Sequence, residues 1–203
     1  MESYDSVRRR LGFERQFPVS ENWSAAADFL QLIADHCLTH KPDTIVECSS
    51  GLTTLVLAGC CRLNGSGHVY SLENGDEFAA NTRDQLDEFS LTGFATVMYA
   101  PLERRTVGGD EYNWYSLDEL QANNIDMLVI DGPPGFLQKN SRYPAMPLLY
   151  DRLSDGCAVF LDDAARDDEK AIVDLWLSLY PSCSHTYIAT QRGCAVLNLD
   201  RKD

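Results

Sequence analysis

Residues 45–55 read IVECSSGLTTL, in which a short apolar run ends in an acid, two serines and one glycine. A second apolar segment follows at helical spacing, so the residues are typical of a buried strand that turns into a helix. In a protein that alternates strands and helices, such a turn is where a cofactor binds against the helix N-terminus. A helix that is merely capped by serines explains the same residues. The turn therefore predicts an α/β fold and leaves a cofactor site open.

The segments on either side continue this alternation of strand and helix patterns. Helices are expected over residues 24–39, 53–62, 76–90 and 167–179, and from the proline-rich loop 131–135 to about residue 153. Strands are expected over residues 44–47, 68–72, 95–99, 125–130 and 157–161. Residues 101–124 are expected to be mostly loop, except for a short helix that opens at the capping box 116–119.

The end of the chain breaks the alternation. Residues 184–190 and 193–199 both have strand patterns, and only Gln191 and Arg192 separate them. So short a connection makes an antiparallel hairpin, because parallel neighbours need a crossover of about a dozen residues or more. We therefore expect a doubly wound, mostly parallel, seven-stranded sheet with a C-terminal antiparallel hairpin. Residues 24–203 are expected to form this domain, and residues 1–23 either the arm of a homodimer or a lid over the site.

Composition narrows the class of partner. The chain has 203 residues, enough for one core, and a formal net charge of −14. That charge would repel nucleic acid and anionic membranes, which leaves a small molecule as the expected partner. No apolar stretch follows the three N-terminal arginines, and no run approaches the ~20 apolar residues of a membrane span, so neither a signal peptide nor a membrane segment is expected. The seven scattered cysteines contain no CxxC pair, which favours a cytoplasmic protein with reduced thiols.

Acidic residues stand at the ends of the expected strands. Ligands of open α/β sheets bind beyond the carboxyl ends of the strands, where the strand order reverses. Four of the five ends carry a carboxylate; these are Glu47, Glu73, Asp131 and the pair Asp162 and Asp163. So many acids at one edge predict that this edge holds the functional site.

The first two ends favour a nucleoside cofactor. Beyond Glu47, the helix N-terminus offers free backbone N–H groups, and Gly51 allows a close approach. Hydroxyl groups line the same turn, from Ser49, Ser50, Thr53 and Thr54. Glu73 stands where an acid accepts hydrogen bonds from both ribose hydroxyls of an adenosine cofactor, although an exposed loop acid has the same pattern. Neither GxGxxG nor GK[ST] is present, which argues against a pyrophosphate.

The last two ends bring three carboxylates together, since the fourth and fifth strands should be neighbours. Asp131, Asp162 and Asp163 would repel one another unless a cation or a proton compensates. Oxygen ligands suit a hard ion such as Mg²⁺ or Ca²⁺, so a divalent metal on these three residues is one hypothesis. In the other, one acid caps a helix, one touches the cofactor and one faces water.

Six motifs stand in a fixed order along the chain. They are VECSSGLTT (46–54), SLE (71–73), APL (100–102), DGPPG (131–135), RYPA (142–145) and DD (162–163). Together they resemble class I S-adenosylmethionine-dependent methyltransferases, most closely a small bacterial O-methyltransferase type, over about residues 24–199. The resemblance implies a Rossmann-like methyltransferase fold, S-adenosylmethionine as cofactor, and a small-molecule oxygen as the methyl acceptor.

The resemblance also implies roles for individual residues. Glu47 would orient the turn or the methionine amino group, Glu73 would bind the ribose, and residues 100–102 would border the adenine. Asp131 would lie near the methionine end and the transferred methyl. The expected cofactor-binding residues are Glu47, Ser49, Ser50, Gly51, Thr53, Glu73, Asn74, Ala100, Pro101, Leu102, Asp131 and Gly132.

Catalysis needs a group that removes a proton from the acceptor hydroxyl. Asp131 and Asp163 are the expected bases, with His185 a weaker candidate. In metal-dependent relatives a cation on the acids of these two strands lowers the pKa of the hydroxyl, but they also have a lysine shortly after the fourth strand, where this chain has residues 132–135. Ser49 likewise replaces the usual first glycine. Alternatives are a binding protein that kept the fold without catalysis, and a nucleotide-dependent oxidoreductase.

Two long loops, residues 104–115 and 132–143, are expected to shape the acceptor pocket. Five aromatic residues are either its walls or packing over the sheet edge; they are Tyr112, Trp114, Tyr115, Phe136 and Tyr143. Three arginines are candidates to bind an acidic acceptor; they are Arg104, Arg105 and Arg142.

Overall fold

The structure is a computed structural model that describes residues 3–21 and 23–200. Its helices are α1 (Tyr4–Arg10), α2 (Ala27–His40), α3 (Leu52–Asn64), α4 (Asp76–Glu88), α5 (Ala145–Leu149) and α6 (Asp167–Leu179), with 3₁₀ turns at Gly135–Leu137 and Tyr150–Arg152. Its strands are β1 (Thr44–Cys48), β2 (His68–Glu73), β3 (Ala95–Tyr99), β4 (Leu102–Val107), β5 (Asp110–Tyr115), β6 (Ile125–Ile130), β7 (Leu153–Asp162), β8 (Ser184–Ile188) and β9 (Cys194–Asn198).

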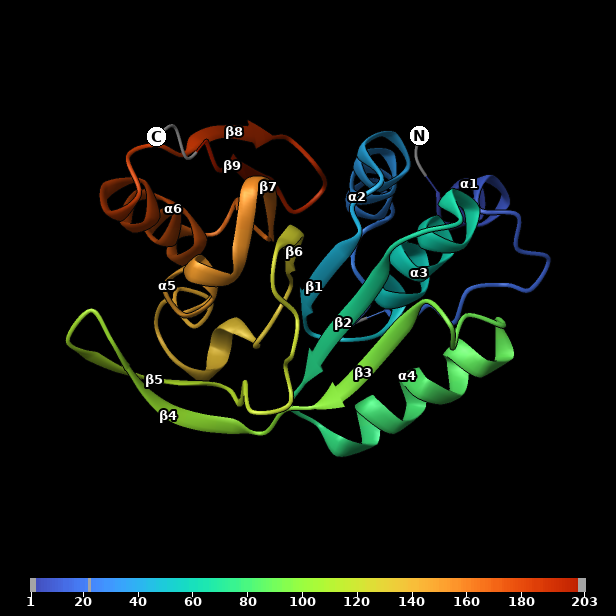
Figure 1. The fold of residues 1–203 in the computed structure, drawn as a ribbon, viewed down its shortest axis with the longest axis horizontal. Coiled ribbons are helices and arrows are strands. Elements are labelled where there is room, and N and C mark those ends of the chain that lie inside the picture. Colours follow the sequence, from blue (N-terminus) through green and yellow to red (C-terminus); the bar gives the residue numbers. More distant parts are fainter. Residues whose placement is uncertain (1–2, 22, 201–203) are drawn as a thin grey trace.

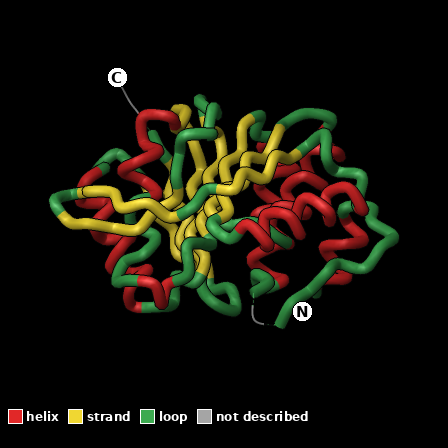
Figure 2. The backbone as a smooth tube through the Cα atoms, turned by 90° about the horizontal axis from the view of Figure 1, so that it is seen from below, coloured by secondary structure: helices red, strands yellow, loops and turns green. Residues whose placement is uncertain are grey.

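Seven strands form one sheet between two layers of helices (Figures 1 and 2). Their order is β3-β2-β1-β6-β7-β9-β8. The first five are parallel, and β9 runs antiparallel to both β7 and β8. This confirms the expected doubly wound sheet with a C-terminal antiparallel hairpin. The strand order reverses beside β1, which has β2 on one side and β6 on the other, so a ligand crevice is expected beyond the ends of β1 and β6.

Each strand presents its residues alternately to two separate cores. In β1, Ile45 faces the core formed with α1, α2, α3 and α4, whereas Val46 faces the core formed with α5, α6 and the β4–β5 hairpin. Both residues are fully buried. Strands buried on two faces read as continuous apolar runs, which is why β1 and β6 were recognisable in the sequence.

Residues 101–124 differ from the prediction of a loop with a short helix. The segment forms the two-stranded hairpin of β4 and β5, which extends from the carboxyl edge of the sheet (Figure 1). Gly108 and Gly109 make the turn with φ angles of 64° and 94°, as a tight hairpin requires. The charged residues of β4 hid its strand pattern. The capping box at 116–119 leads only to a turn, because no amphipathic helix follows it.

The predicted helix up to residue 153 is also wrong. The chain instead forms a 3₁₀ turn, the five-residue α5 and a second 3₁₀ turn, and β7 begins at Leu153. Pro144 and Pro147 lie in this region, and each lacks the backbone N–H that a longer helix would need. These short elements bring Arg142 to the end of β7, where its Nη1 donates to the Asp162 carbonyl.

The N-terminal segment contains a helix, α1, that the sequence analysis did not predict. Val7 and Leu11 are fully buried in the core shared with α2 and α3, and the Tyr4 hydroxyl donates to the Ala25 carbonyl at 3.0 Å. The role of residues 1–23 as an arm or a lid stays a prediction.

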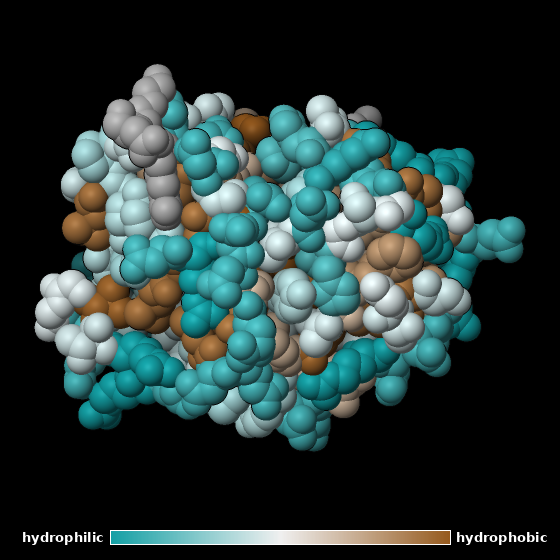
Figure 3. Space-filling model, viewed as in Figure 1, coloured by the Kyte–Doolittle hydropathy of each residue, from teal (hydrophilic) through white to brown (hydrophobic). Residues whose placement is uncertain are grey.

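The surface seen in Figure 3 is mostly hydrophilic, with hydrophobic residues in separate groups. Within residues 3–21 and 23–200, no helix combines the length and apolar character needed to cross a bilayer. All seven cysteines are buried, as is usual for cysteine side chains that pack as small apolar groups.

Candidate functional site

The turn after β1 brings the backbone into an unusual conformation. Ser49 has a φ of 119° and Gly51 a φ of 135°, both in a region that favours glycine. The Ser49 N–H donates to the Leu72 carbonyl at 2.9 Å, which ties the turn to β2, and the Gly51 N–H donates to Oγ1 of Thr54 at 3.0 Å. A serine side chain at position 49 therefore carries backbone strain that a glycine would not.

Replacing Ser49 with glycine is expected to raise the free energy of unfolding by about 1 kcal/mol, because it relieves this strain. Ser50→Gly is the matched control. Ser50 has no positive φ to relieve, and it would lose the hydrogen bond to Glu73, so that change should lower stability. Urea unfolding of the three proteins measures both effects. Equal stability of Ser49→Gly and the original protein would show that the turn is unstrained.

Glu47 is a fully buried acid at the end of β1. Its Oε2 accepts hydrogen bonds from Oγ1 of Thr54 and Oγ of Ser71, both at 2.6 Å. Its Oε1 is buried and has no hydrogen-bond partner among the described residues. Burial raises the pKa of Glu47 to about 7, against the opposing effect of these hydroxyl groups. Oε1 is thus a buried acceptor that no hydrogen bond of the described residues satisfies.

The raised pKa of Glu47 makes stability depend on pH. Between pH ~4.5 and ~7 the unfolded chain ionises this acid while the folded chain keeps it protonated, so the free energy of unfolding falls as pH rises. Glu47→Gln removes this pH dependence. On going from pH 4.5 to pH 8, the free energy of unfolding of the variant is expected to rise by up to ~3 kcal/mol relative to that of the original protein. Urea unfolding at both pH values measures it. A parallel pH dependence of the two proteins would contradict the buried, protonated state.

Glu73 ends β2 beside the same turn, and only 7% of it is exposed. Its two oxygens accept from Oγ of Ser50 and from the Gly75 N–H, each at 2.9 Å. The N–H of Ala100 donates to its carbonyl at 2.7 Å, which brings the end of β3 and residues 100–102 to the same edge. An exposed aromatic pair, Trp23 and Phe78, lies nearby with ring centroids 6.2 Å apart, and Phe78 packs against Gly75.

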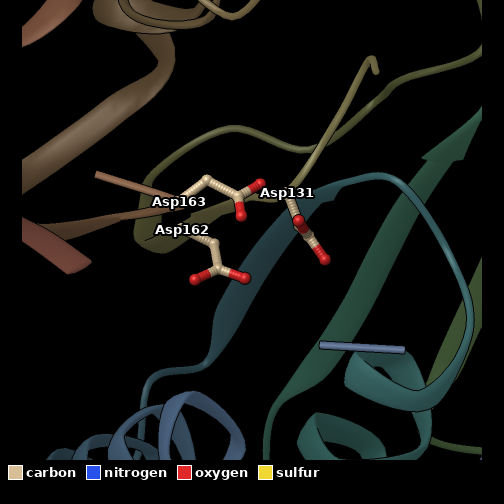
Figure 4. Close-up of side chains that lie close together, drawn as sticks. All are labelled: Asp131, Asp162 and Asp163. Atoms are coloured by element: carbon tan, nitrogen blue, oxygen red, sulfur yellow. The ribbon is translucent and has the colours of Figure 1, made fainter. Parts of the chain in front are cut away.

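Asp131, Asp162 and Asp163 come together at the ends of β6 and β7 (Figure 4). One oxygen of each lies within 4.8 Å of the others, and no other group of three or more candidate metal ligands occurs in the part of the chain described. The Asp131 N–H donates to the Cys48 carbonyl at 3.1 Å, so this acid is joined to the turn after β1. The acids at the strand ends thus form one continuous edge around the reversal of strand order.

Arg142 lies among these three acids, and only 3% of its side chain is exposed. Its Nη2 is 2.9 Å from Oδ2 of Asp163 and 3.3 Å from Oδ1 of Asp131. Nη2 also donates to the Asp131 carbonyl at 2.7 Å, and Nη1 donates to the Asp162 carbonyl at 2.9 Å. The guanidinium therefore joins the ends of β6 and β7 as well as neutralising their acids.

The three acids differ in their contacts and their exposure. Asp163 is held by Arg142 and by Nη1 of Arg166 at 2.8 Å, and it is almost fully buried. The Asp131 side chain is 15% exposed, and burial raises its pKa to about 6 despite the charge of Arg142. Burial and the neighbouring acids raise the pKa of Asp162 to about 8. Of the two candidate bases, Asp131 has the more accessible carboxylate.

The predicted pocket aromatics fall into different environments. Tyr115 is buried with its hydroxyl against Gly132, where an added Cβ would overlap it, so it packs directly behind the turn after β6. Trp114 is fully buried in the core, whereas Phe136 is 79% exposed. Tyr112 and Tyr143 pair with centroids 5.5 Å apart. A hollow of about 380 Å³ beside them is lined by Asp110, Glu111, Tyr112, Gln138, Lys139 and Asn140.

Three predicted residues lie outside this edge. His185 is an exposed residue of β8, paired with Leu197 across from Val159 rather than beside Asp162, so it is not a base for this site. Arg104 and Arg105 pair with acids of their own hairpin, Glu111 at 3.5 Å and Glu103 at 2.7 Å. Glu169 was not predicted as a site residue; it is a buried acid on α6 that lies 3.9 Å from Nε of Arg142. Its position in an acidic first helical turn gave no sign of burial.

Comparison with known proteins now identifies the family. A family model described as a methyltransferase domain matches residues 46–164, more than half of the chain. The chain belongs to this methyltransferase-domain family. The match runs from within β1 to the residues just past the end of β7, and so contains Glu47, Glu73 and the three aspartates at the strand ends. Among curated protein sequences, none matches this methyltransferase-domain chain significantly.

Solved structures share the fold of this methyltransferase domain. An O-methyltransferase from Bacillus cereus in complex with SAH has 15% identity and a TM-score of 0.67, and the alignment covers 97% of this chain and 90% of that one. A SAH-bound methyltransferase from Podospora anserina has 13% identity and a TM-score of 0.67, with 98% and 86% covered. TomG, an O-methyltransferase from Streptomyces achromogenes in complex with SAM, has 13% identity and a TM-score of 0.65, with 96% and 86% covered. They confirm the methyltransferase fold expected from the sequence.

Proposed function

We propose that this protein transfers a methyl group from S-adenosylmethionine to an oxygen of a small molecule. The observation that carries the proposal is the continuous acidic edge formed by Glu47, Glu73 and Asp131 where the strand order reverses. Family membership supports methyl transfer, and the SAM- and SAH-bound neighbours of the same fold support this choice of cofactor.

The residues at this edge fit the cofactor. Glu73 presents a nearly buried carboxylate that would accept hydrogen bonds from the two ribose hydroxyls, and Ser50 and Gly75 hold it in place. The unpartnered Oε1 of Glu47 would accept from the methionine ammonium group. Residues 100–102 and Asn74 would border the base and ribose, and Phe78 would shield them from water.

The same acids disfavour a nucleotide-dependent oxidoreductase. A dinucleotide would place its pyrophosphate at the N-terminus of α3. There the Ser49 side chain replaces the glycine that allows close approach, and Glu47 lies directly behind the turn. A pyrophosphate would also meet the negative charge of Asp131 beside this turn, whereas a positive sulfonium and ammonium would meet opposite charge.

When bound, the cofactor would supply a methyl group already activated by the positive charge of its sulfonium. The chain must then hold the acceptor in line, exclude water and remove a proton from the hydroxyl. Asp131 is the proposed base, because its carboxylate is partly accessible and is ionised at neutral pH with a pKa of about 6. Asp163 acts instead through Arg142, by keeping the end of β7 in place.

Isothermal titration with S-adenosylhomocysteine tests the cofactor. We expect binding in the micromolar range and at least a tenfold loss for Glu73→Ala, since a charged hydrogen-bond acceptor is removed. Glu77→Ala, an exposed acid in the first turn of α4, is the matched control and should bind normally. Binding of NADH in place of S-adenosylhomocysteine would support the oxidoreductase and overturn the proposal.

A panel of acceptors tests the reaction itself. With saturating S-adenosylmethionine, release of S-adenosylhomocysteine should occur with phenols or other hydroxylated small molecules and not with the matching amines. Tight cofactor binding without turnover on any hydroxyl acceptor would favour a binding protein that has kept the fold. Turnover only on amines would overturn the assignment of oxygen.

A further inference from the structure

We propose that the guanidinium of Arg142 takes the place of a divalent cation between Asp131 and Asp163, so that this site works without a metal. The inference concerns the same edge as the proposed function and rests on it only for the reaction carried out there. Its test measures cation binding with no cofactor or acceptor present. The proposal of a metal-free site can therefore be refuted while the proposed function holds, and the proposed function can be refuted while the metal-free site holds.

The guanidinium of Arg142 lies where a cation bound by the three aspartates would lie. A cation held by three carboxylates would sit among the inner oxygens of Asp131, Asp162 and Asp163, which approach within 4.8 Å of one another. Nη2 of Arg142 is already bonded to two of these residues, at 2.9 Å to Oδ2 of Asp163 and 3.3 Å to Oδ1 of Asp131. A bound ion would have to share these oxygens with a positive group almost in contact with it.

Several contacts hold the Arg142 side chain in this position. Nη1 donates to the main-chain carbonyl of Asp162, and Nη2 donates to that of Asp131 and contacts the carboxylates of Asp131 and Asp163. Glu169 lies 3.9 Å from Nε, which has no hydrogen-bond partner among the described residues. With 3% of its side chain exposed, the guanidinium cannot swing into water to admit an ion without breaking all of these contacts. Arg142 is thus a fixed structural counterion of the acids at the ends of β6 and β7.

Arginine side chains already pair with most of the acids around this cluster. Two guanidinium groups, Arg142 and Arg166, lie against the carboxylates of Asp163 and Glu169, and Arg142 also lies against Asp131. This leaves Asp162, whose two buried oxygens have no hydrogen-bond partner among the described residues, as the one aspartate of the cluster outside these ion pairs. One carboxylate is a weak ligand set for Mg²⁺ or Ca²⁺.

The decisive experiment titrates Mg²⁺, Ca²⁺ and Mn²⁺ into the protein at constant ionic strength, with calorimetry and thermal unfolding as readouts. The original protein should show no saturable heat and no rise in Tm, with or without prior treatment with EDTA. Arg142→Ala should gain a cation site, because removal of the guanidinium leaves three facing carboxylates. We expect its Tm to rise by about 5 °C or more when the cation is at ~100 times its Kd.

Two further variants separate charge replacement from a merely structural role. Arg142→Lys keeps a positive group at the site and should stay indifferent to cations. Arg166→Ala removes the other, half-exposed partner of Asp163 and should also gain no site, since Arg142 remains. Saturable binding of one cation to the original protein, lost in Asp162→Asn, would overturn the proposal, and this titration decides the matter even if Arg142→Ala does not fold. A folded Arg142→Ala that ignores all three cations would overturn it as well.

Discussion

Replacement of Asp131 by asparagine is expected to slow methyl transfer by about 100- to 10,000-fold, the usual contribution of a general base. Asparagine keeps the size and shape of the side chain but cannot take the proton of the acceptor. In the original protein the rate should fall as pH is lowered through about 6, because Asp131 becomes protonated below its raised pKa. Turnover with an acceptor from the hydroxyl panel, at saturating S-adenosylmethionine, measures both effects.

Two controls make this prediction specific to the base. S-Adenosylhomocysteine should still bind to Asp131→Asn, so that the loss lies in turnover. Asp163→Asn should lower stability more than turnover, because Asp163 is bonded to Arg142 and Arg166 rather than open to an acceptor. If Asp131→Asn turned over at the original rate while Asp163→Asn lost activity at unchanged stability, the roles of the two aspartates would be reversed.

Replacement of Arg142 by alanine is expected to lower the free energy of unfolding by about 3 to 5 kcal/mol. The change leaves Asp131, Asp163 and Glu169 as neighbouring buried acids without their shared counterion. It also removes the hydrogen bonds to the main-chain carbonyls at the ends of β6 and β7. Urea unfolding in the presence of EDTA, followed by tryptophan fluorescence, measures the loss.

Arg166→Ala is the matched control for this stability effect. Arg166 pairs with the same acids, at 2.8 Å from Asp163 and 3.9 Å from Glu169, but half of its side chain is exposed to solvent. Its removal should therefore cost less than about 1 kcal/mol. A loss of similar size for both variants would mean that burial of the guanidinium is not what stabilises the strand ends.

The sequence alone predicted the sheet well, for a physical reason. Buried strands such as β1 and β6 are continuous apolar runs, and the two-residue gap before Gly193 forces an antiparallel hairpin. The β4–β5 hairpin was missed because Arg104 and Arg105 put charge into a strand that is covered on one face only. The Gly108–Gly109 turn was the available signal, since paired glycines between residues of high strand propensity indicate a tight hairpin.

The sequence predicted those residues of the site that lie at the ends of strands. The convergence of Asp131, Asp162 and Asp163 followed from two adjacent parallel strands, and the structure brings them together. Arg142 belongs to the RYPA motif, but the only role predicted for it from the sequence was to bind an acidic acceptor. Its burial depends on how the loop after β6 folds back through short 3₁₀ and helical turns, and nothing in local periodicity encodes that path.

A crystal structure of the protein grown with S-adenosylhomocysteine and Mg²⁺ tests the central claim most directly. We predict that the ribose hydroxyls lie on Glu73, that the methionine ammonium lies on Glu47, and that the sulfur faces Asp131. Arg142 should keep its contacts with Asp131 and Asp163, with no ion between them. S-Adenosylhomocysteine bound elsewhere, or absent from a well-ordered site at saturating concentration, would contradict the proposal that this acidic edge binds the methyl donor.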